Sequence, residues 1–326
     1  MGIQSRGKDR FGQAQFHGEL QAPPGFSSLV TVGMSVGGPV AIWSSGDGDA
    51  ELHVRHERPG WASFPGTVPG TKPAVALVAY AGSGVAPSAV VRVPALPVAH
   101  PKIDVLADAS FLVVGARCKW RESGPELNAL AVGQNGQIFR RGCLGDGIQH
   151  LQVAEDGTIW TGYFDEGIFG NFGWGNPGPA PLGAGGIAAW SPAFEKVWDL
   201  DPREVEVDDC YAFNVGSDEV LACSYVDFPV IRIRNRQATS AATNGISGPV
   251  GIIASGDWVG LIGSYDDPSL LITGTIRDGK FRESERVNLR APDGTPLPVV
   301  RPCCRGSVAH FFGAGKWYSF DLQDMD

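Results

Sequence analysis

Short apolar runs separated by turns rich in glycine and aspartate recur along the whole chain. Residues 148–200 give the template for this pattern, with turns at Glu155-Asp156-Gly157 and Ser191-Pro192. The four apolar runs of the template lie at residues 148–153, 158–164, 186–190 and 196–200. Runs of this length, bounded by turn residues, predict short antiparallel strands, and no stretch has the period of an amphipathic helix. The pattern therefore predicts an all-β protein built from four-stranded units.

The same grouping of apolar runs recurs on both sides of the template. The further groups fall at residues 28–64, 102–141, 209–240, 249–283 and 308–320. Asn135-Gly136, inside one of these groups, is a strong signal for a β-hairpin. In the first group we expect the third strand at residues 51–54. The last group lacks outer strands, and we expect residues 13–20 to complete it.

Four-stranded units of about 40 to 60 residues repeated around an axis are typical of a β-propeller. We therefore predict a single propeller domain over residues 1–326 with about six blades. Strands from both termini would close the ring, which removes the open sheet edges that invite aggregation. Residues 70–97 leave three alternatives open. They form an insertion, part of the first blade, or a reduced extra blade that would make the protein seven-bladed.

One repeat resembles a known kind of propeller. Residues 151–162 contain the core Asp156-Gly157-x-Ile159-Trp160-x-Gly162. This core is similar to the repeat of the two-component-regulator propellers and of their NHL relatives. The other units keep the hydrophobic spacing without the motif, so the resemblance implies a propeller fold and says little about function.

The composition favours a folded, acidic protein. Hydrophobic residues make up 43% of the chain and charged residues 19%, which is ample material for a core. The net charge of −9 argues against a nucleic-acid partner and favours attraction for cations or basic groups. We expect a cytoplasmic protein with no membrane partner, because we find neither a long apolar span nor a signal peptide. Reduced thiols are expected, with a vicinal disulfide or a soft-metal site at Cys303-Cys304 as the alternative.

The loops after the second strands repeatedly contain carboxylates. In a propeller these loops and the loops between blades lie on one face, and loops on a rigid scaffold often carry binding residues. A tyrosine stands two residues before the acid in Tyr163-x-Asp165, Tyr225-x-Asp227 and Tyr265-x-Asp267. The corresponding loop at residues 117–122 is mostly basic. The candidate binding residues on this face are His100, Arg117, Asp165, Phe172, Trp174, Asp227 and Asp267.

Carboxylates that converge on a central channel repel one another, and such a site can capture a cation. Asp146, Asp208 and Asp209 are the candidate metal ligands, and calcium would suit such an all-oxygen shell. His150 is the candidate general base, because imidazole titrates near neutrality. The alternative is structural: these aspartates cap their own turns, the tyrosines pack between blades, and His150 is a paired residue of an inner strand. No motif fixes a cofactor.

Residues 169–179 form a long loop rich in aromatic residues and glycine, including Phe172 and Trp174. Such a loop either provides a docking surface or folds back over the channel mouth. The sequence contains no G-x-S-x-G, H-E-x-x-H or P-loop motif. We favour a non-catalytic module that binds a small molecule or a protein on its acidic, aromatic face. The alternative is a metal-dependent hydrolase or lactonase, for which six-bladed calcium lactonases are an analogue in fold only.

Overall fold

The computed structural model describes residues 11–57, 59–60, 63–298 and 301–325, and the fold is all-β. In this described part of the chain, the main strands form six antiparallel groups of four, and a parallel pairing of Asn214 with Cys304 joins the fourth and sixth groups into one eight-stranded sheet. The first two groups are β3 (Ser28–Ser35), β4 (Gly38–Ser44), β7 (Val75–Tyr80) and β8 (Pro87–Val93), and β9 (Pro101–Val105), β10 (Phe111–Gly115), β13 (Ala129–Val132) and β14 (Ile138–Gly142). The next two are β15 (Ile148–Val153), β16 (Ile159–Tyr163), β17 (Ile187–Trp190) and β18 (Lys196–Asp199), and β19 (Cys210–Val215), β20 (Val220–Ser224), β21 (Val230–Arg234) and β22 (Gln237–Ala241).

The last two groups recruit strands from the beginning of the chain. The fifth group is β23 (Gly251–Ser255), β24 (Trp258–Ile262), β25 (Leu270–Arg277) and β26 (Lys280–Arg290), to which β1 (Phe11–Gln13) adds in parallel. The sixth is β27 (Cys303–Arg305), β28 (Val308–Gly313), β29 (Lys316–Asp321) and β2 (Gln15–Glu19). The antiparallel pairing of β2 with β29 confirms that residues 13–20 supply the outer strand of the last unit.

Short elements decorate this framework. They are the helices α1 (Gly48–Leu52) and α2 (Asp165–Phe169), the 3-10 turn η1 (Leu322–Met325), and the two-residue strands β5 (Arg55–His56), β6 (Phe64–Pro65), β11 (Trp120–Arg121) and β12 (Gly124–Pro125). Helices α1 and α2 both lie in loops between the second and third strands of their groups.

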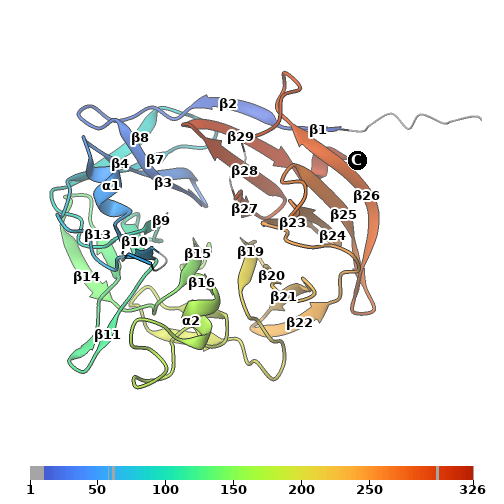
Figure 1. Cartoon of the computed structure of the whole chain (residues 1–326). Coiled ribbons are helices and arrows are strands. Elements are labelled where there is room, and N and C mark those ends of the chain that lie inside the picture. Colours follow the sequence, from blue (N-terminus) through green and yellow to red (C-terminus); the bar gives the residue numbers. More distant parts are fainter. Residues whose placement is uncertain (1–10, 58, 61–62, 299–300, 326) are drawn as a thin grey trace, which may run out of the picture.

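The six groups are arranged around a common centre (Figure 1). Their innermost strands are in contact around a complete circuit, from β3 to β9, β15, β19, β23, β27 and back to β3. Apolar side chains fill the space between neighbouring groups, so strands such as β10 are buried along their whole length. The arrangement is propeller-like, and it places the loops of all groups on two opposite faces.

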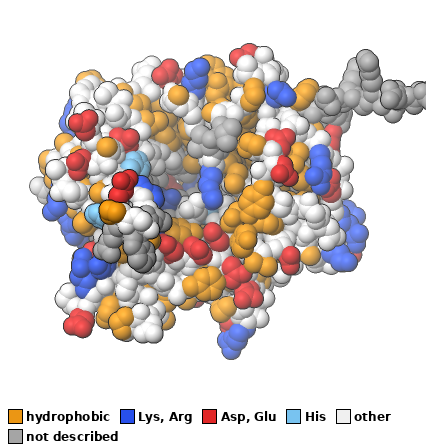
Figure 2. Space-filling view, viewed as in Figure 1, with side chains coloured by type: hydrophobic (Ala, Val, Ile, Leu, Met, Phe, Trp, Pro, Cys, Tyr) orange, Lys and Arg blue, Asp and Glu red, His pale blue; other side chains and the backbone are white. Residues whose placement is uncertain are grey.

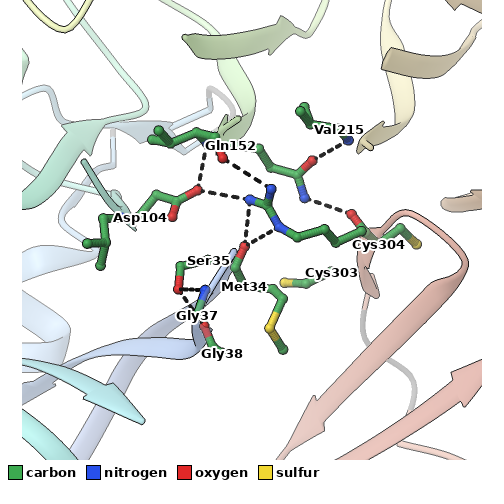
Figure 3. Close-up of polar contacts among 12 residues, drawn as sticks. Met34, Ser35, Gly37, Gly38, Asp104, Gln152, Val215, Cys303 and Cys304 are labelled. Carbon is green, nitrogen blue, oxygen red and sulfur yellow. Dashed lines mark hydrogen bonds and ion pairs between the residues drawn. The ribbon is translucent and has the colours of Figure 1, made fainter. Parts of the chain in front are cut away.

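A network of polar side chains ties the innermost strands together at their carboxyl ends (Figure 3). Arg305, on β27, donates to the Met34 carbonyl at 2.9 and 3.1 Å and to the Val153 carbonyl at 3.1 Å. It also pairs with the buried Asp104 at 3.3 Å. Gln152 donates to the Cys304 carbonyl at 2.7 Å and accepts from the Val215 amide at 2.7 Å. This network joins five of the six groups across the centre. It therefore closes the centre of the ring at the carboxyl ends of the innermost strands, and we call it the structural closure.

One predicted strand is wrong. Residues 51–54 were expected to form the third strand of the first group, whereas α1 occupies Gly48–Leu52 and the third strand is β7. Of the two apolar residues in this run, Leu52 and Val54, only Leu52 is fully buried. Either a helix or a strand can bury one such side chain, so this short run does not distinguish the two. The pairing of β7 and β8 assigns residues 70–97 to the first group, which was one of the three alternatives.

Candidate binding face

The face opposite the Arg305 network carries the loops that follow the second strands (Figure 2). Figure 2 shows acidic side chains gathered beside a hollow near the centre of this face, next to a strip of hydrophobic side chains. Two flanks of the face combine aromatic residues, carboxylates and an arginine, and they do so in different ways.

The first flank, the arginine clasp, is centred on Arg117, which follows β10. Its guanidinium is 5% exposed and donates to both carboxylate oxygens of Asp146, each at 2.9 Å. It also forms an ion pair with Glu166 at 2.5 Å. The rings of Phe164 and Phe172 lie 5.1 and 4.5 Å from the guanidinium carbon, in cation–π geometry. Arg117 is therefore fully engaged with the protein itself.

The aromatic loop at residues 169–179 is fastened to the arginine clasp. The Trp174 ring is buried and its Nε1 donates to the Cys118 carbonyl at 2.8 Å. The Trp120 amide donates to the Phe172 carbonyl at 3.0 Å. Phe169 remains 66% exposed at one end of the loop. The predicted binding residues Arg117, Phe172 and Trp174 thus come together, but as a packed cluster that joins two neighbouring groups.

The second flank, the tyrosine patch, consists of Tyr211, Tyr225, Phe228 and Tyr265. Tyr211 and Tyr225 stack with their ring centroids 5.6 Å apart, and the Tyr265 hydroxyl donates to the Tyr211 hydroxyl at 3.1 Å. Phe228 lies edge-on to all three tyrosines at 5.5 to 5.7 Å. Tyr225 and Tyr265 are 46% and 59% exposed, although each ring is held by neighbours. The patch is a rigid aromatic surface that faces solvent.

A strained turn holds the tyrosine patch in place. Three consecutive residues, Val226, Asp227 and Phe228, have φ angles of 62°, 59° and 47°. Residues with a side chain rarely adopt this left-handed conformation, and a run of three is costly. Thr243 stabilises the turn, because its hydroxyl lies 3.0 Å from the Asp227 carbonyl and 2.8 Å from the Phe228 carbonyl. The turn drives Phe228 into the interior and leaves Tyr225 outside.

Asp209 and Arg301 lie between the tyrosine patch and the centre of the face. Arg301 donates to the Tyr211 carbonyl at 3.2 Å, with its guanidinium carbon 5.6 Å from the Tyr211 ring. Burial, reinforced by the nearby Asp165, raises the pKa of Asp209 to about 6, while Arg301 opposes this shift. A carboxyl group with a pKa shifted toward neutrality is typical of functional sites.

The other predicted binding residues are dispersed. Asp267 caps its own turn by accepting from Ser269 and from Asn288, and the Ser269 hydroxyl bond lowers the pKa of Asp267. His100 contacts the Val54 carbonyl at 3.0 Å, and burial lowers its pKa. Asp227 is exposed beside the tyrosine patch.

The predicted metal ligands and general base do not form a common site. Asp146 uses both carboxylate oxygens on Arg117, while Asp208 and Asp209 lie at the start of another group. Within the described residues, no group of three or more His, Cys, Asp or Glu is placed to hold a metal ion. His150 is bonded through Nε2 to the Cys210 carbonyl at 3.0 Å, and burial lowers its pKa to about 3. An imidazole in this state is a weak base.

Two features of this face were not identified from the sequence: the part played by Tyr211 and Phe228, and the position of Lys102. Tyr211 and Phe228 carried no motif of their own, although Tyr225 and Tyr265 were noted as part of the Tyr-x-Asp pattern. The six cysteines are free, which agrees with the expected reduced thiols and not with the alternative of a disulfide at Cys303-Cys304; Cys118 and Cys143 approach to 3.5 Å between sulfur atoms. Lys102 lines the hollow at the centre, and only the folded ring brings it there.

Comparison with known proteins supports no closer classification than the fold. The sequence matches no protein-family model and no curated protein. A protein of unknown function from Desulfotomaculum acetoxidans is similar in structure, with a TM-score of 0.50 and 8% identity over 93% of this chain and 85% of that one. BamB from Moraxella catarrhalis has a TM-score of 0.40 and 13% identity over 90% and 83% of the two chains.

The WD40 domain of Toxoplasma gondii coronin has a TM-score of 0.46 and 11% identity over 95% of this chain and 75% of that one. At these identities the similarity concerns the arrangement of strands alone. The fold assignment therefore rests on the strand pairing and the contact circuit of this chain. Within the described residues, no helix is long and apolar enough to cross a membrane.

Proposed function

We propose that the protein is a non-catalytic binding module in which one face of a six-bladed propeller holds a basic segment of a partner protein. The six blades are the six four-stranded groups of the described residues, and the circuit of their innermost strands supports this count. In this proposal residues 1–326 form one domain. The tyrosine patch is the contact surface.

The observation that carries the proposal is the exposed but immobilised state of Tyr225 and Tyr265. Aromatic side chains that are already fixed lose little conformational freedom on binding, which is why such residues dominate protein interfaces. Here the strained turn and the buried Phe228 fix the tyrosine rings before any partner arrives. Strained backbone of this kind clusters at binding and active sites.

The charge around the tyrosine patch defines the partner's chemistry. Asp227 and Asp266 are exposed next to Tyr225 and Tyr265, and the whole chain carries a net charge of −9. Carboxylates attract lysine and arginine, and tyrosine rings attract the same cations through their faces. Arg301 covers one ring of the patch, that of Tyr211. A partner segment with a basic residue beside an apolar one fits this surface best.

The proposal is tested with a pool of short fluorescein-labelled peptides, each with a Lys-Arg pair beside one apolar residue. A matched pool carries a Glu-Asp pair instead. We expect fluorescence anisotropy to report binding of the basic pool only, and this binding to weaken as salt is added. The double variant Tyr225→Ala/Tyr265→Ala should weaken binding at least about tenfold, as for interface hot spots.

Two matched controls separate a specific loss from general damage. Phe139 is 53% exposed and lies on the outer strand β14. Trp258 is 45% exposed and lies at the end of β24 that is far from Tyr265. Phe139→Ala and Trp258→Ala should leave peptide binding unchanged. Equal binding of both peptide pools, or undiminished binding by the double tyrosine variant, would overturn the proposal.

A further inference from the structure

A cavity of about 110 Å³ lies between the innermost strands. It is lined by residues of β3, β9, β15, β19 and β27, among them Thr31, Lys102, Gln149, His150, Phe213 and Cys303. Gln152 and Cys304, which belong to the structural closure around Arg305, also line it. The cavity is thus separate from the tyrosine patch, and the closure forms its inner end.

Lys102 is the unusual group in this cavity. Its ammonium makes no hydrogen bond or ion pair with any described residue. The carboxylate on its own strand, Asp104, is already paired with Arg305. The other ionisable groups that act on Lys102 are Cys303 on β27 and Arg301, which precedes that strand, and His150 on β15 faces the same cavity. No carboxylate among them compensates the charge of Lys102.

Lys102 is only partly exposed in this cavity, and an ammonium there with no carboxylate partner favours either loss of its proton or binding of an anion. Burial lowers the pKa of Lys102 to about 8, with Arg301 acting in the same direction and Cys303 opposing. At neutral pH the charged form therefore still predominates. Burial also raises the pKa of Cys303 to about 11, so its thiol is uncharged and cannot serve as the counter-ion.

We propose that the central cavity binds a small carboxylate, with its oxygens on the Lys102 ammonium and its short carbon chain against Phe213. A cavity of about 110 Å³ accommodates only a few carbon atoms. Thr31 on β3 and Gln149 on β15 also line the cavity and offer polar groups for further hydrogen bonds. The hollow in Figure 2 lies at the centre of the same face, where a small molecule could enter.

The test uses propionate as the probe and propionamide as a neutral molecule of the same shape. We expect propionate to raise the thermal midpoint of the wild-type protein increasingly with concentration, since it binds the native state only. Propionamide, and sodium chloride at equal ionic strength, should not do so. Isothermal titration calorimetry of the same pair should give heat of binding with propionate alone.

Lys102→Met removes the charge and keeps the length of the side chain. This variant should fold, and its ligand-free midpoint should equal or exceed that of the wild type, because a partly buried charge with no carboxylate partner is gone. Its response to propionate should be lost. Lys316→Met, at an exposed lysine on β29, is the matched control and should respond like the wild type.

The pH dependence provides a second readout. The carboxylate binds the ammonium form of Lys102, so its dissociation constant should rise about tenfold per pH unit above about 8. An unchanged midpoint in propionate, an equal response to propionamide, or a response that persists in Lys102→Met would each overturn the proposal. The Tyr225→Ala/Tyr265→Ala variant should bind propionate normally, so failure of the peptide test and failure of this one are distinguishable.

Discussion

The arginine clasp and the tyrosine patch occupy the same face and use similar residue types. They differ in how far these side chains are paired with other groups of the protein. In the clasp, Arg117 is buried between Asp146 and Glu166 and two aromatic rings. Beside the tyrosine patch, Arg301 is exposed and makes no ion pair with a carboxylate among the described residues, and two tyrosine rings of the patch face solvent.

Under the proposed function, this difference separates structural residues from recognition residues. A buried charge needs pairing, and both carboxylate oxygens of Asp146 are used on Arg117, so the buried part of the clasp is committed to the fold. Exposed rings that are held by a strained turn remain able to contact a ligand. We therefore expect binding at the flank whose side chains are left unpaired by the protein itself, although both flanks use the same residue types.

Replacing each arginine by leucine should give the largest contrast between the flanks. Arg117→Leu leaves Asp146 buried without its cation, and burial already raises the pKa of that carboxyl. We expect a loss of about 3 to 5 kcal/mol in the free energy of unfolding at neutral pH. Arg301→Leu should change it by less than about 1 kcal/mol, since Arg301 is exposed.

Urea unfolding of both variants measures these differences. Tryptophan fluorescence gives an independent signal, because the Trp174 ring packs on the clasp and should become exposed when Arg117 is replaced. Equal losses of unfolding free energy in the two variants would show that Arg117 contributes no more to stability than Arg301 does.

The strand framework was largely predictable because apolar runs and turn residues are local signals. The four runs between residues 148 and 200 correspond to β15–β18, and the Asn135-Gly136 hairpin joins β13 to β14. The innermost strand β27 was missed as a strand. It is three residues long and contains Arg305, whose burial depends on partners from other groups. No local pattern contains that information.

The site was less predictable, and the Tyr-x-Asp pattern shows why. In the third group Tyr163 is buried, and its hydroxyl donates to the Leu144 carbonyl at 2.6 Å. Tyr225 and Tyr265 carry the same pattern and are exposed. The direction of Tyr225 depends on left-handed backbone at Val226 and Phe228, which those residue types do not predict. Identical spacing therefore gave one structural tyrosine and two surface tyrosines.

The strained turn itself offers a test of intermediate size. Val226→Gly should stabilise the protein by about 1 kcal/mol, because glycine accepts the left-handed conformation and Val226 is 53% exposed. Val226→Ala is the matched control, since alanine keeps the conformational penalty. Denaturant unfolding compares the two. A glycine variant no more stable than the alanine variant would mean that the turn stores no strain, which would weaken the distinction between the flanks.

The smallest expected effect concerns Asp209, at the border of the tyrosine patch. Its folded-state pKa of about 6 lies above the usual value, so its ionisation destabilises the fold. The stability that accompanies the protonated form is present below about pH 4 and is lost as the pH rises through about 6. Asp209→Asn should therefore match the wild-type melting temperature near pH 4 and exceed it near pH 8.

Asp165→Asn sharpens this prediction. Removing the neighbouring negative charge should lower the pH at which Asp209 titrates, because Asp165 is the second cause of the shift after burial. Melting temperatures of the wild type and both variants between about pH 4 and pH 8 provide the measurement. A constant difference between Asp209→Asn and the wild type across this range would exclude titration of Asp209 as the cause. The negative charge beside the patch would then come from the exposed Asp227 and Asp266 alone, and peptide binding would be independent of pH near 6.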